Sequence, residues 1–301
     1  TEADRSEVAE LIYASINTWY QLRGLPAIFH GGPEVTDVFY EVYSGISPGC
    51  CVVAEHPQTG RLMGCCFYHP RESHFGLGIM TVHPNHFGRG VGGKLLSWIL
   101  AEADRRGAPA VRLTQSALNV DSFSLYTRAG FVPRAAFQDM LLPVPEDGLH
   151  VDLPGCDRVR PGTVNDIPAM VRLEQDVSGI SRTQDFTYCL ENQLGFWSTL
   201  VLEGAAGELD GFLISSGHAA VNILGPGVTR TEEDAAALLV RSLDLHRGRT
   251  PVFLVPVDRA GLVRQMYDIG ARNCEMHFCQ VRGKFQQFNG ISLPSFLPET
   301  G

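Results

Sequence analysis

The sequence TVHPNHFGRGVGGKLL, residues 81–96, decides the fold of this 301-residue chain. It continues an apolar run, Phe75–Val82, that is typical of a strand, and it opens a helix whose inner face begins with Leu95 and Leu96. Glycines let the backbone approach a ligand closely, and the first N–H groups of a helix lack intrahelical acceptors. The positive end of the helix dipole lies at the same place. The stretch therefore predicts an anion site that suits a pyrophosphate.

Two other nucleotide-binding loops fit this stretch poorly. The run Gly88–Gly93 lacks the GxGxxG spacing of a dinucleotide site, and the nearest downstream acids, Glu102 and Asp104, fall within the same helix instead of ending a second strand. A P-loop is disfavoured because Lys94 is followed by leucine, where a Ser or Thr would hold magnesium.

A second motif, NVDSFSLYTRAGF at residues 119–131, follows the glycines after the helix and a strand-like run, Ala110–Thr114. The order and spacing of the two motifs resemble the GCN5-related N-acetyltransferase (GNAT) family, over roughly residues 1–142. The positions that carry the likeness are Val82, Pro84, Gly88, Arg89, Gly90, Val91, Gly92, Leu95, Leu96, Asn119, Ser122, Leu125, Tyr126, Gly130 and Phe131.

The resemblance implies an α/β (α+β) fold, in which a mixed β-sheet flanked by helices splays open between two central parallel strands. Acetyl-CoA, the acyl-donor substrate of the family, would lay its pantetheine arm along the strand before the loop and its pyrophosphate on the loop amides. Tyr126 matches the tyrosine that protonates the departing CoA thiolate, and a phenol of ordinary pKa, about 10, can act as that acid. The residues assigned in this way are Met80, Thr81, Val82, Phe87, Gly88, Arg89, Gly90, Val91, Gly92, Gly93, Asn119 and Tyr126.

Simpler structural roles remain open for the two residues of the second motif. Asn119 matches the asparagine that commonly contacts the cofactor in the family, but an asparagine before a helix also serves as an N-cap. Tyr126 could be a core aromatic residue with its hydroxyl at the surface.

The sequence departs from the family at two positions. Phe87 stands where Gln or Arg is common, which removes a side chain but no backbone donor. Many relatives carry a glutamate midway along the strand before the loop, whereas this chain has Leu77 there. A general base would then act from farther away through water, with Glu55, Glu72 and His74 as candidates. An acceptor amine that is already partly neutral would need no strong base.

The second half of the chain repeats the plan of the first. Residues 143–157 contain three prolines and little apolar periodicity, so we interpret them as a linker. Thr163–Asp166, followed by a helical apolar pattern, then repeats the arrangement that begins at Thr1. We therefore expect two tandem GNAT-like domains, 1–142 and 158–301.

The second domain lacks a usable pyrophosphate loop. Its counterpart, LGPGVTRTEED at residues 224–234, puts three acids at a helix N-terminus, and Pro226 has no amide to donate. Tyr267 and Gly270 keep a trace of the tyrosine–glycine motif, one residue short. We interpret this half as a degenerate GNAT-like domain that packs on the first and helps to shape the acceptor site.

The composition limits the partners. The 24 basic and 33 acidic side chains give a net charge of −9, which argues against nucleic-acid binding. No apolar run reaches the roughly 18 to 20 residues that span a bilayer, so we expect a soluble protein without a membrane partner. Eight cysteines without a CxxC pair favour small buried side chains over metal ligands, and a reducing, cytoplasmic compartment.

The chain begins at Thr1 with no signal-peptide pattern, which suggests a trimmed sequence. It ends in LPETG, residues 297–301, which resembles a sortase recognition site. A sorting signal also needs a hydrophobic stretch and a basic tail after the glycine, so we expect coincidence or design for these five residues.

These observations predict an acetyl-CoA-dependent N-acetyltransferase in which the amine of a small-molecule acceptor attacks the thioester directly. The alternative is a non-catalytic acyl-CoA-binding or interaction protein on the same fold, in which the missing strand glutamate reflects lost chemistry. Use of another acyl group is a third possibility. The sequence leaves the acceptor, the acyl-chain length and the oligomeric state open.

Overall fold

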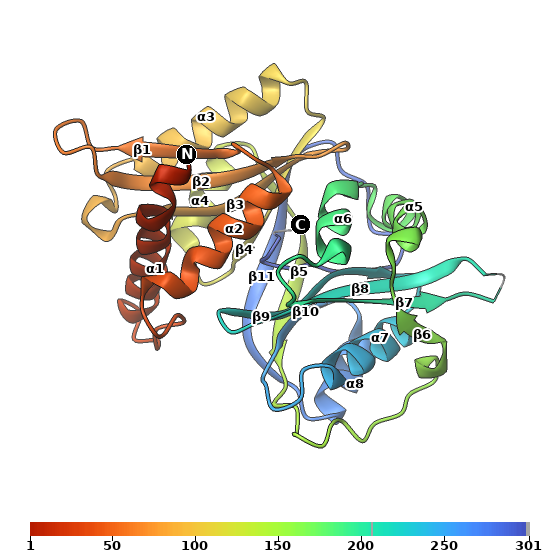
Figure 1. Cartoon of the computed structure of the whole chain (residues 1–301). Coiled ribbons are helices and arrows are strands. Elements are labelled where there is room, and N and C mark those ends of the chain that lie inside the picture. Colours follow the sequence, from red (N-terminus) through yellow and green to blue (C-terminus); the bar gives the residue numbers. More distant parts are fainter. Residues whose placement is uncertain (206, 299–301) are drawn as a thin grey trace.

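The structure is a computed structural model that describes residues 1–205 and 207–298 (Figure 1). Residues 299–301 of the LPETG segment therefore lie outside the described residues. The helices are α1 (Arg5–Gln21), α2 (Asp37–Ile46), α3 (Val91–Arg105), α4 (Val120–Arg128), α5 (Ile167–Ser178), α6 (Thr183–Glu191), α7 (Glu232–Asp244) and α8 (Ala260–Asp268). The strands are β1 (Cys51–Glu55), β2 (Leu62–Pro70), β3 (Phe75–Val82), β4 (Ala110–Ser116), β5 (Val132–Leu141), β6 (Val159–Pro161), β7 (Trp197–Glu203), β8 (Leu209–His218), β9 (Val221–Thr229), β10 (Val252–Pro256), β11 (Arg272–Gly283) and β12 (Ile291–Leu293).

Local sequence signals set several helix ends. Gly90 is the N-cap residue of α3, the helix after the glycine loop, and its φ of 80° favours glycine. A capping box between Thr163 and Asp166 precedes α5, and Gly179 ends α5 with a φ of 68°. Thr231 caps α7 by accepting a hydrogen bond from the backbone N–H of Asp234.

The described strands form one mixed 12-stranded sheet, in the order β1-β2-β3-β4-β11-β5-β10-β9-β8-β7-β6, with β12 beside β9. β11, near the end of the chain, lies antiparallel between β4 and β5, and β5 in turn lies between β11 and β10 (Figure 1). The N-terminal half (residues 1–142) and the C-terminal half (residues 158–298) have therefore exchanged a strand. Backbone hydrogen bonds join the two halves along several residues, and the sequence pattern gave no indication of this.

Two pairs of parallel strands separate after a short contact. In the N-terminal half, β3 and β4 pair only at Phe75↔Val111 and Gly76↔Arg112. In the C-terminal half, β9 and β10 pair only at Ile223↔Val252 and Leu224↔Phe253. The splayed sheet expected from the family resemblance is thus present in both halves.

The two splays differ in what lies between their strands. Beyond Leu224, β12 pairs antiparallel with β9, so that Leu293 faces Gly227 and Ile291 faces Thr229. Ile291 and Leu293 are buried in the core of this half. The chain itself therefore fills the splay of the C-terminal half, whereas no strand in the described part of the chain fills the splay between β3 and β4.

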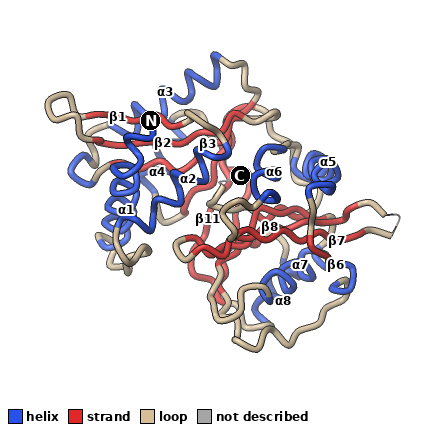
Figure 2. Tube along the Cα trace, viewed as in Figure 1, coloured by secondary structure: helices blue, strands red, loops and turns tan. Residues whose placement is uncertain are grey.

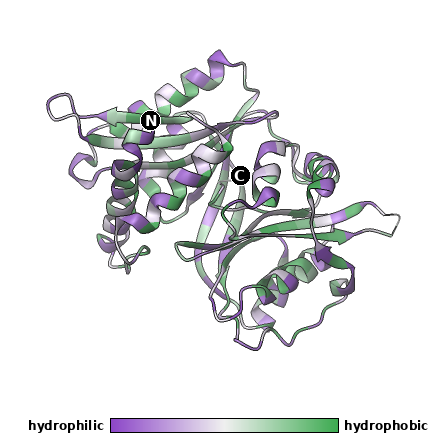
Figure 3. Cartoon of the chain, viewed as in Figure 1, coloured by the Kyte–Doolittle hydropathy of each residue, from purple (hydrophilic) through white to green (hydrophobic). Residues whose placement is uncertain are grey.

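Helices cover both faces of the sheet (Figure 2). Hydrophobic residues follow the strands, and hydrophilic residues dominate the outer loops (Figure 3). One core beneath α3 belongs to the N-terminal half, and a second beneath α7 and α8 belongs to the C-terminal half. A third core joins α1 and α2 to α5 and α6, and so buries apolar surface from both halves together.

The sequence located β3 with the bounds expected, Phe75–Val82, and β4 to within two residues of its end. It missed α2 and α6. The α2 sequence, DVFYEVYSGI, is rich in β-branched and aromatic residues that favour strands. Its buried positions Val38, Val42 and Ile46 nevertheless recur at helical spacing, because the helix packs against the shared core.

Candidate functional site

The open splay between β3 and β4 forms one wall of a cavity of about 1170 Å³. Both halves line it. The N-terminal half supplies α1, the β3 edge, the loop before α3, the end of β4 and α4. The C-terminal half supplies the β8–β9 turn, β11 and Phe296. Of the twelve residues assigned from the sequence, eleven are among the described residues that line this cavity, and Arg89 is not.

The glycine loop leads into the N-terminus of α3. No side chain caps this helix, and Lys94 is the first residue whose N–H reaches back to Gly90 O, at 3.1 Å. The N–H groups of Val91, Gly92 and Gly93 are thus left without helical acceptors beside the cavity. An anion placed here would gain these donors and the favourable end of the helix dipole.

The glycines of the loop have two different explanations. Gly88 and Gly90 have φ angles of 70° and 80°, which L side chains rarely adopt. Gly92 lies in the helix, and a Cβ there would meet Leu125 and Val82 at an ordinary 3.7 Å. The fold alone therefore gives no steric reason for Gly92, although alanine would stabilise the helix. The glycine leaves the backbone of the first turn of α3 uncovered beside the cavity.

The edge of β3 that faces β4 is available to an extended ligand. After Gly76 this edge has no partner strand among the described residues, while the opposite edge stays paired with β2 up to Val82. A bulge at Gly78 and Ile79, opposite Phe67, marks the point where β3 turns away from β4. A peptide-like arm could pair with the free edge as an added strand does.

The two residues of the second motif lie on the cavity wall. Asn119 caps α4, because its Oδ1 accepts a hydrogen bond from Ser122 N at 3.1 Å. The capping role is therefore real, and Asn119 lines the cavity as well. Tyr126 is buried on α4, with its ring edge-to-face against Phe131 at a centroid distance of 5.7 Å. It too lines the cavity.

The three residues considered from the sequence as general bases do not line the cavity. Glu55 is exposed at the end of β1. Glu72 accepts a hydrogen bond from the Ser181 hydroxyl at 3.2 Å. His74 is fully buried beside Ser73, and burial together with nearby arginine charges holds the pKa of its imidazole well below the ordinary value.

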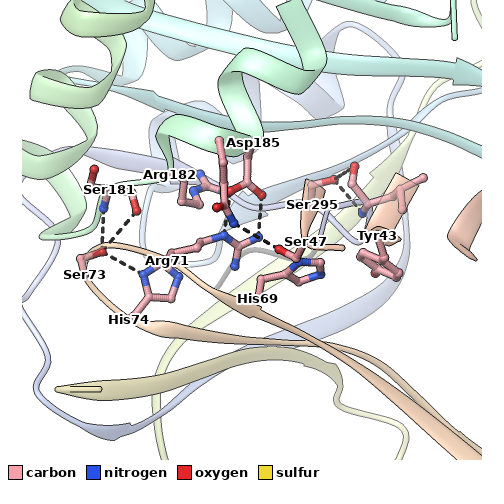
Figure 4. Close-up of polar contacts among 12 residues, drawn as sticks. Tyr43, Ser47, His69, Arg71, Ser73, His74, Ser181, Arg182, Asp185 and Ser295 are labelled. Atoms are coloured by element: carbon pink, nitrogen blue, oxygen red, sulfur yellow. Dashed lines mark hydrogen bonds and ion pairs between the residues drawn. The ribbon is translucent and has the colours of Figure 1, made fainter. Parts of the chain in front are cut away.

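Glu72 and His74 belong instead to the contact between the halves, where Ser181 donates to Glu72 through its hydroxyl and to Ser73, the neighbour of His74, through its backbone N–H. Figure 4 shows the Ser181, Ser73 and His74 contacts. There Arg71, at the end of β2, forms two hydrogen bonds of 2.8 and 2.6 Å with Asp185 on α6, and both side chains are fully buried. A Cβ on Gly76 would lie 2.0 Å from the Arg71 guanidinium. The glycine in β3 therefore makes room for this ion pair, at the point where β3 and β4 separate.

The cavity also contains ionisable residues that the sequence analysis missed. Glu275 and Asp139 are paired across β11 and β5, and both line the cavity. The Glu275 carboxylate accepts hydrogen bonds from Tyr20 at 2.9 Å and from Ser116. His277 Nδ1 lies 2.7 Å from Asp139 Oδ2. Glu275 and His277 are two residues apart on β11, so their side chains lie on the same face of the strand. The strand exchange brings that face to the cavity.

The corresponding loop of the C-terminal half has a different chemistry. The first turn of α7 carries Glu232, Glu233 and Asp234, and Asp234 pairs with Arg158 at 2.6 Å. Glu232 accepts a hydrogen bond from the N–H of Leu262 at 2.6 Å. These carboxylates complement the helix dipole and would repel a pyrophosphate.

Among the described residues, no three His, Cys, Asp or Glu side chains group as metal ligands. No helix in the same part of the chain combines the length and apolarity that a membrane-spanning helix requires.

Comparison with known proteins gives a family match in the N-terminal half. Residues 16–131 match the model of the acetyltransferase (GNAT) family. No curated protein matches the sequence.

Solved structures resemble the whole chain in fold. A protein of Pyrococcus horikoshii provisionally assigned as an acetyltransferase matches with a TM-score of 0.74 at 16% identity, over 99% of this chain and 93% of its own. A GCN5-related N-acetyltransferase of Sphaerobacter thermophilus matches with a TM-score of 0.63 at 18% identity, over 96% and 95%. A tandem GNAT protein from the clavulanic acid biosynthesis pathway matches with a TM-score of 0.58 at 14% identity, over 93% and 95%.

Proposed function

From the premise that residues 16–131 form an acetyltransferase domain of the GNAT family, we propose that this chain is an acetyl-CoA-dependent N-acetyltransferase. It transfers an acetyl group to the amine of a small-molecule acceptor by direct attack. The observation that carries the proposal is the joint position, on one cavity, of a free β3 edge, an uncapped glycine-rich helix start and Tyr126.

Each part of the cavity has a role in this reaction. The free edge of β3, from Met80 to Val82, orients the pantetheine arm, and the amides from Phe87 to Gly93 hold the pyrophosphate. Bound acetyl-CoA supplies an acyl group activated as a thioester. Backbone donors near Val82 polarise its carbonyl, and Tyr126 donates a proton to the leaving sulfur. Residues from both halves enclose the remaining space, which takes the acceptor.

We keep the cytoplasm as the compartment. All eight cysteines are free thiols, and five of them are buried, as expected for a protein of a reducing environment. The degenerate C-terminal half binds no acetyl-CoA in this proposal, because β12 occupies its splay and carboxylates occupy its helix start.

Calorimetric titration of acetyl-CoA tests the proposal, with Gly90→Glu as the variant and Gly107→Glu as its control. The two glycines flank α3, have φ angles of 80° and 69°, and have no atoms within 4 Å of an added Cβ. Both changes therefore cause similar backbone strain, but only Gly90→Glu adds a carboxylate to the loop. We expect one site in the parent and the control, and at least a 100-fold weaker affinity in Gly90→Glu.

Other outcomes would change the proposal. Two sites in the parent would contradict the assignment of the C-terminal half. No binding to a folded parent would contradict the transferase proposal. Binding without turnover on any amine would favour the non-catalytic acyl-CoA-binding alternative.

A further inference from the structure

The carboxylates of Glu275 and Asp139 lie in the cavity without an arginine or lysine partner, and the one imidazole beside them is that of His277, with Nδ1 2.7 Å from Asp139 Oδ2. Within residues 1–205 and 207–298, no Arg or Lys nitrogen lies within 4.0 Å of either carboxylate. Asp139 is 2% exposed, and its Oδ1 has no hydrogen-bond partner among these residues. A buried carboxylate oxygen without a donor is unfavourable, and a cationic ligand would satisfy it.

Two hydroxyl groups of the N-terminal half hold Glu275 in position. Tyr20 on α1 and Ser116 at the end of β4 both donate to its carboxylate. Burial and the negative charge of Glu275 raise the pKa of Tyr20 far above its ordinary value, so this phenol stays protonated and remains a donor. The two donors fix the orientation of the carboxylate toward the cavity, where it can contact an ammonium group.

The two arginines on the cavity wall are engaged elsewhere. The Arg23 guanidinium lies 3.8 Å from the Trp19 ring centroid, and 3.7 Å from Asp121. Arg128 donates to the backbone carbonyl of Ser124 at 3.1 Å and is exposed. Neither guanidinium pairs with Glu275 or Asp139, so both carboxylates remain without an arginine partner in this part of the cavity.

Apolar side chains line the same cavity as the acidic groups. Trp19 and Phe29 line the cavity from the N-terminal half, and Phe29 packs edge-to-face on Phe39 at a centroid distance of 5.7 Å. Val221 and Phe296 line it from the C-terminal half. This combination of an apolar wall and an acidic group is complementary to an amine on an apolar body.

We propose that Glu275, which the exchanged strand β11 brings into the cavity, is the catalytic residue that binds the ammonium group of the acceptor and takes its proton. The acceptors are primary amines on an apolar, aromatic-sized body, without a carboxylate next to the amine, because no arginine or lysine pairs with Glu275 or Asp139 to receive such a carboxylate. This inference rests on the proposed acetyltransferase function.

The proton balance of the step is simple. Glu275 accepts one proton from the ammonium nitrogen and later releases it to solvent. The neutral nitrogen forms the bond to the acyl carbon, and the carbon–sulfur bond breaks with its electron pair on sulfur. Tyr126 donates its proton to that sulfur and recovers one from the nitrogen. In sum, an ammonium ion and acetyl-CoA give an amide, CoA thiol and one proton.

The experiment compares Glu275→Gln with Met276→Gln on the full chain. Met276 is the neighbouring residue of β11, is exposed and does not line the cavity, so it controls for a glutamine in this strand. Tryptamine and tryptophan are the matched acceptors, because they differ only in the carboxylate. We measure acetyl-CoA affinity, tryptamine affinity for the CoA-bound protein, and turnover from pH 7 to 10.

We expect acetyl-CoA affinity to stay within twofold in both variants. At pH 7, Glu275→Gln should bind tryptamine at least 10-fold more weakly and turn over about 100-fold more slowly, the size typical of a lost general base. Its turnover should recover toward the parent as pH approaches the amine pKa of about 10, because the free amine then forms in solution. Tryptophan should be a much poorer acceptor than tryptamine.

Three results would overturn this inference while leaving the acetyl-CoA site intact. They are equal use of tryptophan and tryptamine, a parent that neither binds nor acetylates tryptamine, and a Glu275→Gln defect of the same size at every pH. Loss of acetyl-CoA binding by the parent would instead contradict the proposed function itself.

Discussion

Each half of this protein contains a pair of parallel strands that separate after a short contact, but the two gaps are occupied differently. Between β3 and β4 the gap opens on a cavity of about 1170 Å³. Between β9 and β10 the gap receives β12, which pairs with β9 from Gly227 to Thr229. A splayed sheet needs something to pair with its free backbone groups. The C-terminal half meets this need with its own chain, whereas in the function proposed here the N-terminal half meets it with the pantetheine arm of acetyl-CoA.

The N-termini of the helices that follow the two separated strand pairs, α3 and α7, also differ in charge and capping. Gly92 and Gly93 occupy the second and third positions of α3, and Glu233 and Asp234 occupy those of α7. In α7 the carboxylates and the Thr231 cap satisfy the helix start from within the protein. In α3 the helix start is uncapped. Both differences make the N-terminal half the one able to bind an anionic, extended molecule.

The largest effect is expected from breaking the buried ion pair between Arg71 and Asp185, which lies where β3 and β4 separate. Asp185→Ala leaves the buried guanidinium of Arg71 without its carboxylate, which should lower the free energy of unfolding by about 3 to 5 kcal/mol. Urea unfolding measures this. Asp176→Ala is the control, because it breaks an exposed ion pair with Arg230 and should cost less than about 1 kcal/mol. Equal costs would show that the buried pair does not hold the halves together.

The second prediction compares the two tyrosines at matching places in the halves. Tyr126→Phe should lower turnover about 100-fold with acetyl-CoA affinity unchanged, because the leaving sulfur loses its acid. Tyr267→Phe should leave turnover unchanged, since Tyr267 is exposed and donates to Gln138 at 2.8 Å. Steady-state rates with tryptamine and calorimetry of both variants provide the measurement. A loss of turnover in Tyr267→Phe would mean that the second splay takes part in the reaction.

The smallest effect concerns buried histidines, one in each half. Burial lowers the pKa of His69 to about 3 and that of His246 to about 4. Unfolded histidine has a pKa of about 6.5, so the unfolded chain binds more protons below that pH. The stability that each neutral histidine contributes is present above pH 6.5 and is lost as pH falls toward the folded pKa. For each histidine, the free energy of unfolding should fall by about 1 to 2 kcal/mol between pH 7 and pH 5.

Because β11 and β5 are exchanged, both halves should lose this stability in one unfolding transition. Urea unfolding at pH 7 and pH 5 tests this. His246→Gln should reduce the change between the two pH values, whereas the exposed His150→Gln should not. Two separate transitions would contradict the idea that the exchanged strands make the halves a single cooperative unit.

Much of the candidate site could be predicted because its signals are local. The loop, Asn119 and Tyr126 are recognised by spacing within two short stretches, and each stretch needs only its own strand and helix to take shape. Glu275 could not be found in this way. It meets Tyr20 from 255 residues away along the chain, and nothing in the residues around either one indicates the other. Of Glu55, Glu72 and His74, the candidates for a base acting through water, none lines the cavity, and Glu72 and His74 lie at the contact between the halves.

The division of the chain at residues 142 and 158 stays a proposal about its organisation. The linker interpretation rests on its prolines, while Val144 and Cys156 within it are buried against the C-terminal half. The exchange of β11 and β5 means that neither half contains all the strands of its own sheet.

The glycine-rich helix start and the acidic start of its counterpart could be read from the sequence, because they depend on glycine conformation and on charge at fixed spacing, and the resemblance to a known family implied the splayed sheet of the first half. Only the tertiary structure decided which splay stays open and which carboxylates enter it. Backbone hydrogen bonds between strands carry little sequence information, because every residue except proline offers the same N–H and C=O groups. The positions of β11 and β12 therefore depend on the packing of the whole chain.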